Sequence, residues 1–224
     1  MTIVRWGLTS LLVSALVLSW SVWLLPQGMP RHVGATLAVL LWLFILWFFR
    51  NPRRQPKGGP RTLISSADGV VADITEVDEP EFIGGKAVRI GIFLSVFDVH
   101  VNRAPCPATV RYARYQPGRF LDARHPDATH HNESNTLGLE ADSSVDTGLR
   151  LLLRQISGYI ARRIVCVHGV GDPLTRGELF GMIRFGSRTE LYVPLSHPHD
   201  LLVQVGDRVR CGETALVEMT GEVA

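Results

Sequence analysis

The chain has 224 residues, of which 46% are hydrophobic, and its formal net charge is +2. This length allows one domain of ordinary size with an appendage, and so small a charge, without a basic stripe in the soluble part, gives no reason to expect a nucleic-acid partner. The three cysteines have no C-x-x-C spacing, which argues against a disulfide framework or a cysteine metal site and suits a reducing compartment.

Two apolar runs begin the chain. Residues 6–25 contain no charge and are long enough, at ~1.5 Å per residue, to cross a hydrocarbon layer of ~30 Å. Residues 33–49 are at the short end of a spanning helix, and only Pro26–His32 lie between the two runs. We predict a membrane hairpin rather than a cleaved signal peptide, because the first run lacks an A-x-A site and a second run follows. A single span and a re-entrant second helix are the alternatives.

Basic residues flank the hairpin on one side. Arg5 precedes the first run, and five cations follow the second: Arg50, Arg53, Arg54, Lys57 and Arg61. The positive-inside rule therefore places both ends, and the rest of the chain, on the cytoplasmic face of the cell (inner) membrane. Residues 51–61 form a basic Pro/Gly-rich linker. Its cations either attract anionic lipid or simply stop translocation, and the two roles are compatible.

Residues 62–224 are expected to form a single soluble domain made mainly of β structure. Short β-branched or alternating runs are separated by turn residues throughout this part. The predicted fold class is α+β: a β-rich sandwich or barrel-like domain with lipoyl-type hairpin units, preceded by the hydrophobic helical hairpin. Residues 150–164, "RLLLRQISGYIARRI", fit a short helix as well as two strands interrupted at Gly158.

A short frame occurs twice late in the chain. "VGDPLTRGELFG" begins at Val170 and "VGDRVRCGETAL" at Val205, and both have the form V-G-D-x-Φ-x-x-G-E. The frame predicts two similar β-turn units in which the glycines adopt positive φ, as in lipoyl- or biotinyl-type β sandwiches. The alternative is that V-G-D-x-V is only a common turn of β proteins.

Three islands carry the residue types that chemistry needs. They are "SSADGVV" with Asp68, "FLSVFDVHVNRAP" with Asp98, His100, Asn102 and Arg103, and "FGSR" with Gly186 and Ser187. A Ser-His-Asp hydrolase could use these groups, but the G-x-S-x-G elbow is absent. His125, His130 and His131 lack a convincing ligand spacing, so no metal is expected.

The islands and the segments around them resemble one known family. "WFFRNPRR", "SADG", "FLSVFDVHVNRAP", "HNESNT", "RQISGYIARRIVC" and "GMIRFGSRTELYVP" are similar to the short form of the phosphatidylserine decarboxylase proenzyme family. The resemblance covers nearly the whole chain. It implies self-cleavage between Gly186 and Ser187 into a β chain (1–186) and an α chain (187–224), whose first residue becomes a pyruvoyl group.

The resemblance also implies an activity. The pyruvoyl group made from Ser187 is the covalent cofactor, and it forms a Schiff base with phosphatidylserine, which leaves as phosphatidylethanolamine after CO2 is lost. His100 matches the D-x-H histidine of the family and Asp68 the aspartate of S-x-x-D-G. His100 is then the base for processing and the proton donor in decarboxylation, and Asp68 orients it.

The chain departs from the family pattern at two positions. Long-form members carry a second histidine where this chain has Arg103, and Ser134 replaces the arginine of "NERN". Which group replaces the second histidine is left open. Asn102, Arg103 and Arg188 are candidate substrate contacts. For Arg188 three interpretations are open: contact with an oxyanion, contact with a substrate carboxylate, or exposure to solvent.

The expected partners follow from the same resemblance. They are an anionic phospholipid substrate with its membrane, the α and β chains bound to each other, and a possible second copy of the chain, with no nucleic acid. One alternative is decarboxylation of an ether-type serine lipid. Another is a non-catalytic lipoyl-like adaptor, but Lys86, the candidate attachment lysine, does not lie in a repeat hairpin.

Overall fold

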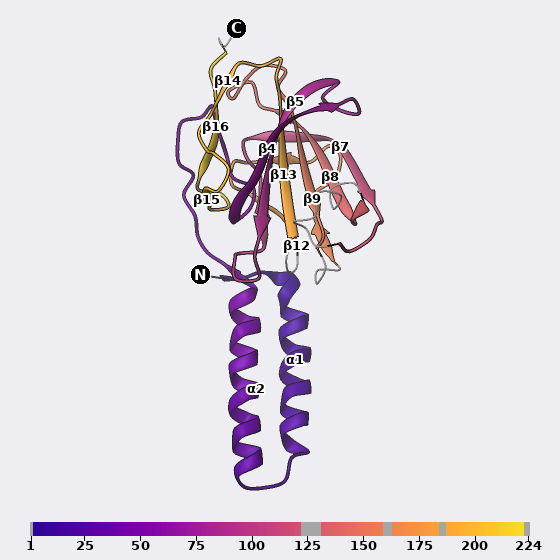
Figure 1. Cartoon of the computed structure of the whole chain (residues 1–224), viewed down its shortest axis with the longest axis vertical. Coiled ribbons are helices and arrows are strands. Elements are labelled where there is room, and N and C mark those ends of the chain that lie inside the picture. The colour runs from indigo at the N-terminus through magenta and orange to yellow at the C-terminus, as the bar shows by residue number, and fades with distance from the viewer. Residues whose placement is uncertain (1, 122–130, 159–162, 184–186, 222–224) are drawn as a thin grey trace. The chain divides into compact units, whose positions relative to one another are not determined.

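A computed structural model describes residues 2–121, 131–158, 163–183 and 187–221 (Figure 1). Its contacts divide the chain into two compact units, residues 1–53 and 54–224. The first is helical and the second is built from strands, which confirms the predicted fold class of a β-rich domain after an apolar helical hairpin.

The first unit consists of helices α1 (Arg5–Trp23) and α2 (Met29–Phe48), with a short pairing of β1 (Thr2–Ile3) and β2 (Arg50–Asn51). Helix α2 starts four residues earlier than residue 33, because Pro30 is well tolerated in a first helical turn, where its missing N–H costs no hydrogen bond. Arg31 donates hydrogen bonds to the carbonyl oxygens of Trp23 and Leu25, at 3.1 and 2.6 Å, and so satisfies the end of α1.

Both helices are long and apolar enough to cross a membrane, with mean hydropathies of 1.5 and 1.7. Large apolar side chains are exposed along both of them, among them Leu16 at 72% and Leu37 at 61%. Apolar surface of this extent is unfavourable in water, so the hairpin is suited to association with a membrane.

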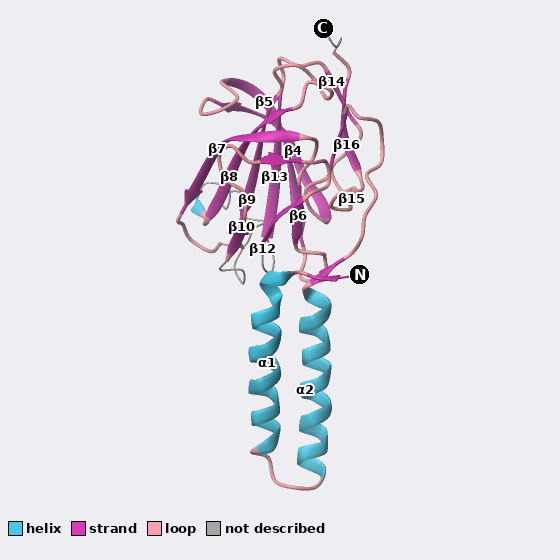
Figure 2. Cartoon of the chain, turned by 180° about the vertical axis from the view of Figure 1, so that it is seen from behind, coloured by secondary structure: helices cyan, strands magenta, loops and turns pink. Residues whose placement is uncertain are grey.

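The described residues of the second unit form three sheets (Figures 1 and 2). The large sheet has the order β11 (Pro173–Leu174), β7 (Ala108–Gln116), β8 (Ser134–Ala141), β9 (Arg150–Ile156), β13 (Ser187–Pro194), β5 (Gly85–Leu94), β4 (Gly69–Glu79), β15 (Arg208–Val209). One small sheet has the order β10 (Ile164–Cys166), β12 (Leu179–Ile183), β6 (Val101–Arg103). The other has the order β14 (His199–Leu201), β16 (Ala215–Met219), β3 (Thr62–Ile64).

The segment of ambiguous pattern forms strands β9 and β10, so the helical alternative is wrong where the structure describes it. Gly158 follows the end of β9, and residues 159–162 lie outside the described part. Strand β9 is long enough to pair with β8 on one side and β13 on the other. These ladder hydrogen bonds, together with burial of Leu151 and Leu153, favour the strand.

The hydrophobic core lies on one face of the large sheet. Alternate residues of its central strands are fully or almost fully buried, including Ile90, Leu139 and Leu191. Phe180 of β12 and Val217 of β16 join the same cluster from the two small sheets. Burying each such side chain contributes about 1.5–3 kcal/mol, so this shared core holds the three sheets together.

The two V-G-D units have the same geometry. Gly171 and Gly206 have φ of 99° and 97°, and both donate hydrogen bonds of 2.8 Å to a neighbouring strand. Asp172 and Asp207 each accept the N–H of the residue three positions earlier, at 2.8 and 2.9 Å. The strands that follow, β11 and β15, form the two edges of the large sheet. The prediction of two similar turn units is therefore confirmed.

Candidate active site

Ser187 is the first residue of β13 and is fully buried. It pairs with Leu94 of β5, and on the other side of β13 the pairing with β9 begins at the next residue, with Arg188 opposite Ile156. The hydroxyl oxygen of Ser187 has no hydrogen-bond partner among the described residues. Gly186, the predicted carbonyl donor, lies outside them. A buried hydroxyl without a partner is costly, which indicates a functional role.

His100 is fully buried beside the chain segment that leads to Ser187. Its carbonyl oxygen accepts the N–H of Ile183, the last residue of β12, at 3.1 Å. Its Nδ1 lies 3.0 Å from the carbonyl oxygen of Asp98. Because a carbonyl can only accept, this contact favours the tautomer with the proton on Nδ1, and Nε2 then carries the lone pair that a general base needs.

A chain of polar side chains, here called the polar chain, crosses the core next to this segment. It consists of Asn135, Gln155, Asn102 and Thr189. Each amide donates to the next member: Asn135 to Gln155 at 3.1 Å, Gln155 to Asn102 at 2.9 Å, and Asn102 to Thr189 at 3.1 Å. The polar chain joins β8, β9, β6 and β13, and so links the large sheet to a small one.

The polar chain also relates His100 to Ser187. Side chains two positions apart on a strand share a face, so Ser187 faces the same way as Thr189 on β13. His100 directly precedes β6, which carries Asn102. The hydrogen bond between Asn102 and Thr189 therefore connects the segment that carries His100 to the strand that carries Ser187. Asn102, predicted to contact substrate, uses its amide on Thr189, Gln155 and the carbonyl oxygen of Ser66.

Gln155 and Thr189 were not identified from the sequence. Their only signal is a polar residue at a core-facing position of an otherwise apolar strand, in "LLLRQIS" and "SRTELYV". Such a position becomes informative once the strand register is known.

Asp68 is almost fully buried. Its carboxylate accepts the N–H of Cys211 at 2.7 Å and pairs with Arg54 at 3.0 Å. Burial raises the pKa of Asp68 above its ordinary value, although Arg54 and the Cys211 N–H act in the opposite direction. The described contact at Nδ1 of His100 is the Asp98 carbonyl, so an orienting role of Asp68 stays a prediction.

Arg103 extends toward the turn of the first V-G-D unit, where it donates to the carbonyl oxygen of Gly177 at 2.7 Å. Its backbone N–H donates to the carbonyl oxygen of Ser66 at 3.2 Å. These contacts tie β6 to a neighbouring turn. A contact of Arg103 with substrate stays a prediction.

Arg188 is buried on the sheet face opposite Ser187, with 7% of its surface exposed, so the interpretation that it is exposed to solvent is wrong. Its guanidinium lies 2.7 Å from Glu190 and 2.6 Å from Asp73. To reach Asp73 on β4 it crosses β5 at Gly91, where a Cβ would overlap with the guanidinium. Burial lowers the pKa of Arg188, but the two carboxylates outweigh this and raise it.

Comparisons with known proteins agree with the resemblance. A family model described as phosphatidylserine decarboxylase matches residues 41–217. The phosphatidylserine decarboxylase proenzyme of Rhodopirellula baltica is 46% identical, over 91% of this chain and 79% of the relative. That of Carboxydothermus hydrogenoformans is 47% identical over 83% and 84%, and that of Symbiobacterium thermophilum 44% over 94% and 89%. The matched region contains all the candidate site residues.

Proposed function

The chain belongs to the phosphatidylserine decarboxylase family, and on this basis we propose that it is a self-processing carboxy-lyase that converts phosphatidylserine to phosphatidylethanolamine and CO2. The observation that carries the proposal is the buried hydroxyl of Ser187, which has no hydrogen-bond partner among the described residues and lies at the start of a strand paired on both sides. This is the type of group that a proenzyme needs at its cleavage point.

Self-processing begins at Ser187. His100 Nε2 accepts the hydroxyl proton while the oxygen attacks the carbonyl carbon of Gly186, so that an ester forms as the peptide C–N bond breaks. Loss of the Cα proton of residue 187 then breaks the bond between its Cβ and the ester oxygen, which releases residues 1–186 with a carboxylate end. The dehydroalanine left at position 187 hydrolyses to a pyruvoyl group and ammonia. A glycine at 186 suits the attack because it has no side chain to obstruct the hydroxyl.

Decarboxylation uses the product of this cleavage. When formed from residue 187, the pyruvoyl group would supply an electrophile for the substrate amine and an acceptor for the electrons released with CO2. The role of His100 is then to deliver a proton to the carbon that has lost CO2. A histidine suits this task because its ordinary pKa lies near ambient pH.

Asp68 has a positioning role in this proposal. Its carboxylate holds the N–H of Cys211, whose thiol contacts the carbonyl oxygens of Ser66 and Val101 at 3.3 Å each. Val101 follows His100 directly in the chain. The ionised form of Asp68 therefore supports the backbone that carries the imidazole.

The two fragments are expected to stay associated after cleavage. The α chain would contain β13 to β16, and each pairs with a strand of the β chain or with another α-chain strand that does. The apolar hairpin would anchor the β chain in the cell membrane with the catalytic domain on the cytoplasmic face, where an anionic phospholipid substrate is available.

Denaturing electrophoresis with intact-mass measurement tests the processing step. The wild-type chain should give fragments 1–186 and 187–224, with the smaller one blocked at its N-terminus, and Ser187→Ala should give one uncut chain. Ser157→Ala is the matched control, because it removes another buried hydroxyl without a described partner, close to Ile156, which pairs with Arg188. An intact wild-type chain would overturn the proposal.

Activity of the processed enzyme tests the second step. Diacyl phosphatidylserine should be converted to phosphatidylethanolamine, and a diether serine lipid assayed in parallel decides between the two substrate classes. His100→Ala should abolish product formation in any fraction that is processed. Wild-type turnover by processed His100→Ala would contradict the role of His100.

A further inference from the structure

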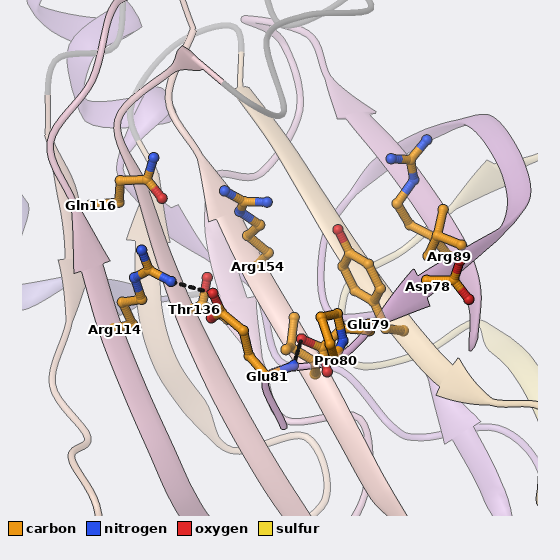
Figure 3. Close-up of a pocket in the computed structure, with 12 residues that line it drawn as sticks. Asp78, Glu79, Pro80, Glu81, Arg89, Arg114, Gln116, Thr136 and Arg154 are labelled. Atoms are coloured by element: carbon orange, nitrogen blue, oxygen red, sulfur yellow. Dashed lines mark hydrogen bonds and ion pairs between the residues drawn. The ribbon is translucent and has the colours of Figure 1, made fainter. Parts of the chain in front are cut away.

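A cavity of about 370 Å³ lies on the sheet face opposite Ser187 (Figure 3). Its floor is formed by β7, β8, β9, β13 and β5, and its cover by the turn between β4 and β5. Tyr192 and Arg154 belong to the floor. Tyr192 lies five positions from Ser187 on a strand without a bulge, so the two side chains point to opposite faces. The cavity is therefore separate from the candidate active site.

Three polar residues of the floor form one row across neighbouring strands. Arg114 is directly opposite Thr136, and Thr136 is directly opposite Arg154. Directly opposed residues have Cβ atoms about 4.5–5.5 Å apart, so the row concentrates two guanidinium groups and a hydroxyl within a small space. Figure 3 shows Arg114, Arg154 and Gln116 together at one end of the cavity, with Arg89 at the other.

Arg154 is the cation at this end that has no ion pair with a described residue. The carboxylate of Glu81 is paired with Arg114, and that of Glu79 accepts the backbone N–H groups of the turn that follows it. Among the described residues, Arg154 makes one side-chain hydrogen bond, to the hydroxyl of Ser134 at 3.3 Å, and no ion pair. Its Nε is buried and has no described partner.

The positive charge at the other end of the cavity already has a negative partner. Arg89 is paired with Asp73 at 3.2 Å, and Asp78 at the margin is exposed to solvent. Arg154 is half-buried and lies directly opposite Glu190 of β13, whose carboxylate is already engaged by Arg188 and by the hydroxyl of Tyr192. A partly desolvated cation without an ion pair of its own gains from a further negative partner. Arg154 therefore marks the point of the cavity at which a negatively charged ligand would be stabilised.

We propose that the cavity binds a phosphate-bearing group through Arg154, with Arg114, Thr136 and Gln116 as further donors. Guanidinium groups bind phosphate oxygens through paired, charge-assisted hydrogen bonds. The hydroxyl of Thr136 and the amide of Gln116 make no hydrogen bond to a described residue and lie along the same wall. The cavity volume exceeds that of the phosphate alone, and Val77, Pro80 and Leu152 provide an apolar wall for the attached carbon atoms.

Equilibrium dialysis of the full-length protein against radiolabelled inorganic phosphate tests the site. The Ser187→Ala chain should bind about one phosphate, as the wild type does, because the cavity does not depend on processing. This comparison separates failure of the site from failure of the proposed enzymatic function. No saturable binding to either protein at millimolar phosphate would overturn the proposal.

Arg154→Gln should weaken phosphate binding at least about tenfold, since a hydrogen bond to a charged group contributes on this scale. Arg111→Gln is the matched control: it removes the same charge from β7, at an exposed residue paired with Glu140, and should leave the affinity within about twofold. Equal affinity in Arg154→Gln and wild type, or equal losses in the two variants, would refute the assignment.

A second pair of variants keeps the test decisive if Arg154→Gln does not fold. Thr136→Val and Gln116→Leu remove neutral donors from the same wall, and each should weaken phosphate binding severalfold. Unchanged affinity in both would also refute the site.

Competition then identifies the source of the phosphate group. Short-chain phosphatidylglycerol below its micellar concentration displaces phosphate at lower concentration than glycerol 3-phosphate does if the site takes a lipid headgroup. The reverse order assigns a soluble phosphate ester. Either order supports the site, whereas failure of both compounds to displace phosphate would contradict a site for phosphate esters.

Discussion

Because Gly91 has no side chain, the guanidinium of Arg188 can pass over it and reach Asp73. The guanidinium of Arg188 occupies the space above this glycine and bridges Glu190 on β13 to Asp73 on β4. A Cβ at position 91 would overlap with the guanidinium and lie 2.9 Å from a carboxylate oxygen of Asp73. Arg188 is next to Ser187, so the contact also fixes the strand at the cleavage point.

We predict that Gly91→Ala destabilises the protein by about 1–3 kcal/mol, because the displaced guanidinium leaves the buried carboxylate of Glu190 without this partner. Chemical denaturation of the Ser187→Ala chain measures this effect without interference from cleavage. Gly85→Ala on the same strand is the control, since a Cβ added there would meet nothing within 4 Å. Equal stability of the two variants would show that Arg188 can be moved without cost.

Arg54 and Asp68 allow a prediction about pH. Burial raises the pKa of Asp68 and the Arg54 cation lowers it, so Arg54→Gln should raise this pKa further. If ionised Asp68 supports His100, the processing rate falls as the pH drops through the pKa of Asp68, because the carboxylate becomes protonated. The acid limb of the rate profile should therefore lie at higher pH in Arg54→Gln than in the wild type. Processing rates measured across the acid range test the shift.

Lys57→Gln is the matched control for this experiment. Lys57 is an exposed cation of the same segment that pairs with Glu213 and not with Asp68. Its removal should leave the acid limb in place. Identical profiles for Arg54→Gln and wild type would contradict the role given to Asp68.

At the scale of elements, the two V-G-D turns have the same backbone geometry. Gly171 and Gly206 have nearly the same positive φ, and a Cβ added at either position would meet nothing within 4 Å. A substitution therefore changes backbone strain alone. Each turn starts an edge strand of the same sheet, so the strain acts at opposite edges.

We predict that Gly171→Ala and Gly206→Ala each cost about 1–2 kcal/mol, the usual penalty for a left-handed conformation in an L-residue. The double variant should lose the sum of the two values within about 0.5 kcal/mol, since the sites share no contact. Urea unfolding of uncleaved protein measures all three variants. Gly169→Ala, at ordinary φ with open space around it, is the control, and a loss there as large as at Gly171 would contradict the argument.

Strands β12 and β13 follow each other in the chain but belong to different sheets. The sequence from Ile183 to Pro194 has one β-like pattern with a Gly-Ser step near its start. In the structure, Ile183 ends a strand of a small sheet and Ser187 begins a strand of the large one. The proposed cleavage point is therefore the place where the chain leaves one sheet for another.

At the scale of the whole molecule, the apolar hairpin and its flanking cations predict on which side of the membrane each segment lies. Gln27 lies in the exposed turn between α1 and α2, and the cations before and after the helices favour the cytoplasmic side for both ends. Gln27→Cys should react with a membrane-impermeant maleimide in intact cells. Lys57→Cys should react only after permeabilisation, and the wild-type cysteines measure the background. Labelling of Gln27→Cys only in permeabilised cells would contradict this orientation.

The sequence by itself determined the apolar hairpin, the β-rich domain, the two V-G-D turns and the family. These features depend on local properties: continuous apolar runs, alternation, glycine at turns, and short motifs such as "FDVHVNR" and "FGSR". The sequence also identified Ser187 and His100 as candidates, because motif residues can be recognised without knowing their neighbours.

Only the tertiary structure decided which residues meet. The polar chain through Gln155 and Thr189, the face on which Arg188 lies, and the place of Arg154 without an ion pair among the described residues all depend on strand register and on pairings between distant segments. A shift of one residue in register would turn each of these side chains to the other face. No local sequence pattern determines the strand register, because the register is set by packing the three sheets around one core.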